Sequence, residues 1–95
     1  MSRIDTLKKA KELIDLVLLD LVNLKTALDS WPQNYPEDHN LLKDIEWHLI
    51  YIDNDADIRS REPSYEINQV EHLRSLREKV IERIQLIENE ATNDC

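Results

Sequence analysis

Three aspartates occupy alternate positions near the middle of the chain: Asp53, Asp55 and Asp57. A calcium-binding loop opens with carboxylates at this spacing, but it needs glycine at its sixth position and a bidentate glutamate at its twelfth. Counted from Asp53, those positions hold Ile58 and Ser64. The run therefore fails as a calcium loop. We interpret the three aspartates as an acidic patch at a helix end, available to a basic partner.

A possible metal-ligand pair lies earlier in the chain. Asp44 and His48 are four residues apart, with His39 and Glu46 near them in sequence. Residues at this spacing share one side of a helix, and both residue types bind metals. A metal site needs three or four ligands, and the sequence offers no convincing third. We therefore predict no metal and no cofactor, and we expect His48 to bond Asp44 at the edge of an apolar helix face.

The best small-ligand candidate follows the acidic patch. Arg59 and Arg61 precede Ser64, which is suited to begin a helix. A helix N-terminus binds anions through its free N–H groups, and Tyr65 could stack on a planar ring. In the competing interpretation, both arginines pair with the neighbouring aspartates.

The sequence does not indicate catalysis. It has no glycine, so it lacks the usual phosphate-binding loop. No set of Ser, His and Asp, or of Cys and His, suggests a nucleophile. Carboxylates such as Glu71, Glu78 and Glu82 are interleaved with basic residues, which is typical of a solvated helix surface. We predict that the protein is not an enzyme.

Length and charge narrow the class of partner. Ninety-five residues make a single domain, 1–95, and the net charge of -8 repels nucleic acids and anionic membranes. The single cysteine, Cys95, cannot form an intrachain disulfide, and the N-terminus lacks a signal-peptide pattern. The apolar run from Leu13 to Leu24 is interrupted by polar residues and is too short to span a bilayer. These features predict a cytoplasmic protein that binds neither membranes nor nucleic acids directly.

Apolar residues recur at alternating steps of three and four in three segments. This spacing predicts helices over 2–30, 37–58 and 64–90, with a frayed tail over 92–95. The expected core positions are Leu7, Ala10, Ile14, Val17, Leu21, Leu24 and Leu28; Leu41, Leu42, Ile45, Leu49, Ile52 and Ala56; and Val70, Leu73, Leu76, Val80, Ile84, Ile87 and Ala91. Trp31 and Tyr35, in a proline-containing loop, are expected to close one end of the core, and the alternative is that they present a recognition surface. Short connections favour antiparallel neighbours, so we predict an all-α, up-down-up bundle of three helices.

The two earlier helices carry more apolar residues than one core face can hold. At 100° per residue, several of them point away from the predicted core. They are Leu16, Leu19 and Val22 in the first helix, and Trp47, Ile50, Tyr51 and Ile58 in the second. An apolar surface with aromatic residues is typical of an interface, so we predict a homodimer or higher oligomer that enlarges the helical bundle. The alternative is an irregular bundle that rotates these side chains into its own core.

Three functional hypotheses remain open. The first is a non-catalytic protein that self-associates and binds or inhibits a partner protein, with the acidic patch facing a basic surface. The second is an acidic nucleic-acid mimic that blocks a DNA- or RNA-binding protein, as an inhibitor of a nuclease or defence system would. The third is a sensor of a metal or an anionic nucleotide.

Overall fold

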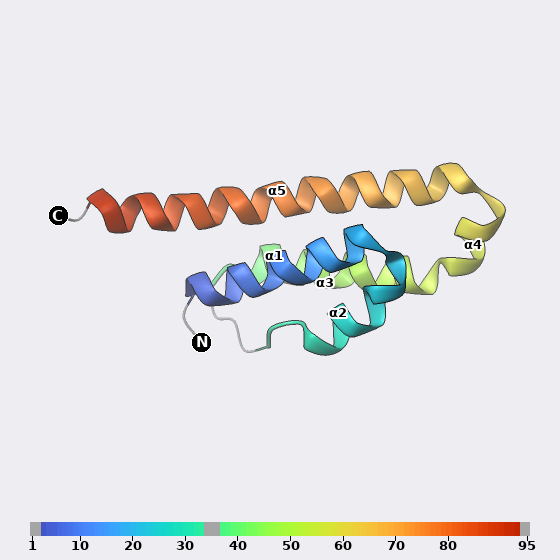
Figure 1. Cartoon of the computed structure of the whole chain (residues 1–95), viewed down its shortest axis with the longest axis horizontal. Coiled ribbons are helices and arrows are strands. Elements are labelled where there is room, and N and C mark those ends of the chain that lie inside the picture. Colours follow the sequence, from blue (N-terminus) through green and yellow to red (C-terminus); the bar gives the residue numbers. More distant parts are fainter. Residues whose placement is uncertain (1–2, 34–36, 94–95) are drawn as a thin grey trace.

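In a computed structural model, which describes residues 3–33 and 37–93, the chain is helical (Figure 1). This confirms the predicted all-α class, because no described residue belongs to a strand. The elements are α1 (Arg3–Leu19), the 3-10 turn η1 (Leu21–Asn23), α2 (Leu24–Ser30), α3 (His39–Asn54), α4 (Ala56–Arg61) and α5 (Pro63–Asn93). The described part of the chain contains no helix long and apolar enough to cross a lipid bilayer.

The predicted first helix, 2–30, is not continuous, because the chain breaks at Asp20, although Leu24–Ser30 is helical as predicted. This residue adopts an extended backbone with φ -160° and ψ 129°, and its carboxylate accepts a hydrogen bond from the Val22 amide. Three residues on, the Asn23 side chain donates to the Leu16 carbonyl over 2.8 Å and caps the end of α1. Short polar side chains compete with a helix in this way, because they bond to nearby backbone groups. The apolar spacing continues through the break, which is why the sequence pattern did not show it.

The break changes the topology. A salt bridge between Arg3 and Asp38 joins the beginnings of α1 and α3, so these two helices run in the same direction (Figure 1). Arg83, in the last third of α5, also contacts Asp38, which makes α5 antiparallel to both. The structure therefore differs from the predicted up-down-up order: α1 and α3 run up, α5 runs down, and the short α2 returns the chain between α1 and α3.

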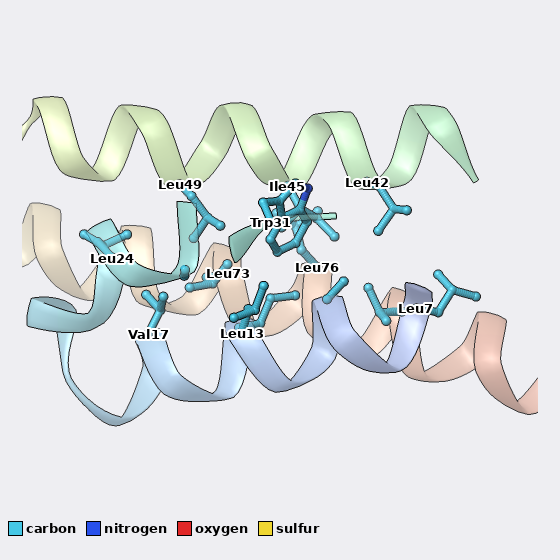
Figure 2. Close-up of a cluster of buried hydrophobic side chains, with 14 of the residues drawn as sticks. Leu7, Leu13, Val17, Leu24, Trp31, Leu42, Ile45, Leu49, Leu73 and Leu76 are labelled. Carbon is cyan, nitrogen blue, oxygen red and sulfur yellow. The ribbon is translucent and has the colours of Figure 1, made fainter. Parts of the chain in front are cut away.

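Four walls surround the core. Each of α1, α2, α3 and α5 packs against the next in a closed circuit, and α2 with the segment after it forms the wall between α1 and α3. Trp31 is buried, but in that wall between α1 and α3 and not across one end of the core as expected; Figure 2 shows its ring within the core cluster. Tyr35 lies outside the described residues. The buried apolar residues are Leu7, Ala10, Leu13, Ile14, Val17, Leu24, Ala27, Trp31, Leu42, Ile45, Leu49, Ile52, Leu73, Leu76, Val80 and Ile84.

The predicted second helix, 37–58, also divides. Its last turn departs from helical geometry at Asp55, and α4 makes the corner to α5. Ala56, expected in the core, is exposed there. Helix α5 begins at Pro63, where proline suits a first turn, and it runs for 31 residues. Residues 92–93 of the predicted frayed tail belong to α5, and 94–95 lie outside the described residues.

Candidate interaction surfaces

A shallow groove runs between α3 and α5. Its central part has a volume of about 530 Å³ and is lined by Asp44, Trp47, His48, Tyr51, His72, Leu76 and Lys79. It adjoins a second hollow through the shared Lys79, where Leu41, Glu82, Arg83 and Leu86 form the walls. We call the two hollows together the α3–α5 groove. Its lining combines exposed apolar side chains with charges of both signs.

An aromatic pair stands on the α3 wall of this groove. Trp47 and Tyr51 are four residues apart, so the helix places them one turn apart on one side. Their ring centroids are 6.2 Å apart with a tilt of 32°. Trp47 is 49% exposed and Tyr51 is 56% exposed. Large, rigid aromatic surfaces of this kind supply much of the binding energy at protein interfaces.

Two histidines face each other across the same groove. His48, on α3, and His72, on α5, meet edge to face with ring centroids 4.5 Å apart. The expected bond from His48 to Asp44 is absent; instead the His48 Nε2 atom lies 3.2 Å from the Gln69 carbonyl oxygen on α5. Burial lowers the pKa of His48, and the neighbouring His72 lowers it further, although the hydrogen bond to Gln69 opposes both. The folded structure therefore favours a neutral His48.

A second exposed apolar group lies at the corner between α1 and η1. Leu16 is 41% exposed, Leu19 is 81% exposed and Val22 is 77% exposed. The extended backbone at Asp20 turns the chain between Leu19 and Val22, so these side chains stand at a bend and not along a straight helix. We call these three residues the corner patch.

The structure does not assemble the predicted interface residues into one face. The α3–α5 groove contains Trp47 and Tyr51 and takes its other wall from α5, with no lining residue from α1. Ile50 is partly buried, and Ile58 is exposed on the short helix α4. Two surfaces thus replace the single expected one. Leu86 on the groove wall was not predicted; its signal in the sequence is an apolar residue on the outward side of the last helix.

The three aspartates of the acidic patch have different surroundings. Asp55 is partly buried and accepts a 2.8 Å hydrogen bond from the Tyr65 hydroxyl. Gln69 also donates to Asp55, over 3.4 Å. Asp53 and Asp57 are exposed. One member of the acidic patch therefore holds the corner between α3 and α5, and the other two face solvent.

The described residues of the anion-site candidate, Arg61, Ser64 and Tyr65, also have different surroundings. Tyr65 bonds Asp55, and the Arg61 Nε atom donates to the Asp57 carbonyl oxygen. Ser64 is exposed in the first turn of α5, and the side chain of Arg59 is outside the described set. Two of the four candidates thus contact residues of the acidic patch, but through a tyrosine and a backbone carbonyl, so the expected pairing of both arginines with aspartates stays a prediction.

Within the described ranges, no three His, Cys, Asp or Glu side chains are grouped so that they could hold a metal ion. No protein-family model matches this sequence, and neither the curated proteins nor the solved structures compared with it include a significant match. The two exposed surfaces, the α3–α5 groove and the corner patch, are therefore the features of the described residues that bear on function.

Proposed function

We propose that this chain is a non-catalytic helical protein that acts by binding other protein chains, and that it forms a homodimer or higher oligomer. The observation that supports this most strongly is the half-exposed pair of Trp47 and Tyr51 in the α3–α5 groove. Burying a few hundred Å² of such apolar surface is worth several kcal/mol before the cost of association, at about 25 cal/mol per Å².

The groove is the primary contact in this proposal, and the corner patch is the second. Trp47 and Tyr51 are large, rigid and already packed side by side, so little side-chain freedom is lost when a partner covers them. Leu19 and Val22 are smaller and stand at a bend. A chain with two separate apolar surfaces can use one for its own copies and keep the other for a different partner, which it would bind or inhibit.

Self-association of this kind must overcome like charge. Each copy carries a net charge of -8, so two copies repel each other, and added salt screens that repulsion. We expect the oligomer to become tighter as salt is raised. A complex with a basic partner would weaken instead, because its attraction is screened in the same way.

The experiment is multi-angle light scattering on the wild type and on two variants, Trp47→Ala and Leu19→Glu. Trp47→Ala should shift the protein toward monomer, and Leu19→Glu should do so only if the corner patch takes part. Ser75→Glu, at an exposed position on α5, adds the same charge as Leu19→Glu and serves as its control. A wild type that stays monomeric at tens of micromolar, at both low and high salt, would show that the chain does not self-associate.

The acidic-mimic hypothesis has weaker support. A mimic must present its carboxylates to a basic channel, yet several of them bond within this fold. Asp15 contacts Lys11 and Arg77, Asp38 contacts Arg3 and Arg83, and Asp55 accepts from Tyr65. The sensor hypothesis has only the shallow groove in its favour. Neither has an observation as specific as the exposed aromatic pair.

A further inference from the structure

Polar contacts join α3 to α5 at three levels along the groove. At one end Arg83 bonds Asp38 over 3.0 Å, and at the other end Tyr65 bonds Asp55 over 2.8 Å. Between them lies the contact of His48 with the Gln69 carbonyl and with the His72 ring. Of the side chains in this central contact, only the histidines change charge near neutral pH. The two histidines are therefore the part of the contact between α3 and α5 that a change of pH near neutrality can alter.

The hydrogen bond fixes which nitrogen of His48 carries the hydrogen. A carbonyl oxygen can only accept, so Nε2 donates to Gln69 and, in the neutral ring, Nδ1 has no hydrogen. A proton taken up by His48 must therefore enter at Nδ1. The bond to Gln69 survives this step, because Nε2 remains a donor. What opposes the added charge is the half-buried position of the ring and the closeness of His72.

The other groups facing the pair do not cancel this opposition. Asp44 and Tyr51 line the groove from α3, and Lys79 lines it from α5. At neutral pH Asp44 carries one negative charge, Tyr51 carries none and Lys79 carries one positive charge. Lys79 thus offsets Asp44, and no described residue of α1, α2 or α4 lines this hollow. The lining of this hollow therefore adds no net negative charge to balance a proton on His48, whose ring centroid lies 4.5 Å from that of His72.

We propose that His48 and His72 form an acid-sensitive contact, which holds α3 against α5 while His48 is neutral and loosens when His48 takes up a proton beside the His72 ring. The proposed contact lies within one chain, so it goes beyond self-association and does not require a second copy. Because the pKa of His48 is lower in the folded chain than in the unfolded one, the unfolded chain binds more protons between those two values. Stability is therefore present above pH 6.5, the ordinary histidine pKa, and is lost as the pH falls toward the folded value.

The test is urea unfolding between pH 7.5 and pH 5.0, at one protein concentration, with light scattering at each pH. The variants are His48→Gln, which keeps an N–H donor for Gln69, and His72→Gln, which removes the second ring. His39→Gln is the matched control, because His39 is exposed at the start of α3 and does not line the central hollow. We expect the urea midpoint of the wild type and of the control to fall over this range, and that of His48→Gln to fall less.

Nuclear magnetic resonance on the intact protein supplies a second measurement that does not require the variants to be stable. The His48 ring should titrate below the ordinary histidine pKa, and the His72→Gln substitution should raise its pKa. Amide exchange around Gln69, corrected for intrinsic rates, should speed up at pH 5.0 more than exchange around Arg77, which faces α1. The proposal is overturned if His48 titrates at or above its ordinary value, or if His48→Gln loses as much stability in acid as the control. A change of oligomeric state without these effects would bear on self-association alone.

Discussion

Replacing Asp38 with asparagine should destabilise the fold by about 2 kcal/mol, because this carboxylate joins three helices. The Asp38 side chain is only 1% exposed. It accepts hydrogen bonds from the Arg3 Nε atom over 2.8 Å, from the Arg3 Nη2 atom over 3.0 Å and from the Arg83 Nη1 atom over 3.0 Å. Asparagine has the same shape and tolerates the left-handed backbone of this residue, φ 58°, so the substitution removes mainly the charge.

The magnitude follows from the exposure of the partners. Hydrogen bonds to charged groups contribute about 1.5–3 kcal/mol each. Solvent screening reduces that here, because the Arg3 side chain is 35% exposed and that of Arg83 is 43% exposed. Asparagine also keeps one oxygen that can accept from an arginine. A net loss of about 2 kcal/mol corresponds to a fall in Tm of roughly 8–16 °C for a domain of this size.

Glu37 provides the matched control. It pairs with the same Arg3 over 3.1 Å, but its side chain is 60% exposed. Glu37→Gln should therefore cost less than about 1 kcal/mol, as exposed ion pairs do. The assay is urea unfolding followed by circular dichroism at pH 7. Equal losses for the two variants, or an Asp38→Asn variant as stable as the wild type, would refute the assignment of Asp38 as the joint between α1, α3 and α5.

Lowering the pH should weaken the same contact between Asp38 and its arginine partners. The hydrogen bond from Arg3 is the main cause that holds the pKa of Asp38 below its ordinary 3.8, although burial opposes it. A carboxylate with a depressed folded pKa stabilises the protein above the pKa of the unfolded chain, and this contribution is lost as the pH falls through the folded value. The difference in stability between wild type and Asp38→Asn should therefore persist at neutral pH and shrink progressively as the pH falls below 3.8.

Two further predictions concern the break in the first helical segment and the tryptophan beyond it. Asp20→Ala removes the carboxylate that accepts from the Val22 amide and should cost about 0.5–2 kcal/mol in urea unfolding, and an unchanged midpoint would show that this bond does not hold the bend. Trp31 has a buried indole N–H without a hydrogen-bond partner in the described structure, and an unpaired buried donor costs about 1–3 kcal/mol. Trp31→Ala should lose about 3–5 kcal/mol of stability. Trp31→Phe removes the unpaired N–H along with some packing, so it should lose far less. Similar losses for the two variants would mean that the indole N–H is satisfied.

The helical class and most of the core were readable from the sequence, because burial on one face of a helix repeats every three or four residues. Leu42, Ile45, Leu49 and Ile52 are buried as the spacing predicts. The outward directions of Trp47 and Tyr51 follow from the same spacing. The second wall of their groove does not, since it depends on which helix packs beside α3, and that is set by residues far away in the sequence.

The contacts that the sequence could not show are long-range or depend on a bend. Asp38 lies 35 residues from Arg3 and 45 residues from Arg83, so no local pattern links them. Asp44 was chosen as the partner of His48 because it is one turn away, yet the ring turns toward α5 and bonds Gln69. A neighbour in sequence is easy to find, but the packing of another helix decides where a side chain at the edge of the core points.

The bend at Asp20 accounts for the position of Asp38 and for the α3–α5 groove. A straight helix from Arg3 to Ser30 would be about 40 Å long at 1.5 Å per residue, and it would carry the chain to the far end of the molecule before α3 began. Asp38 could not then contact Arg3, and α3 would run against α1 and not beside it. Because the chain turns at Asp20 and α2 returns, α1 and α3 start at the same end and α5 packs antiparallel to both. One flank of α5 is then covered by α1, and the other meets α3, where Trp47, Tyr51 and the two histidines line the open groove.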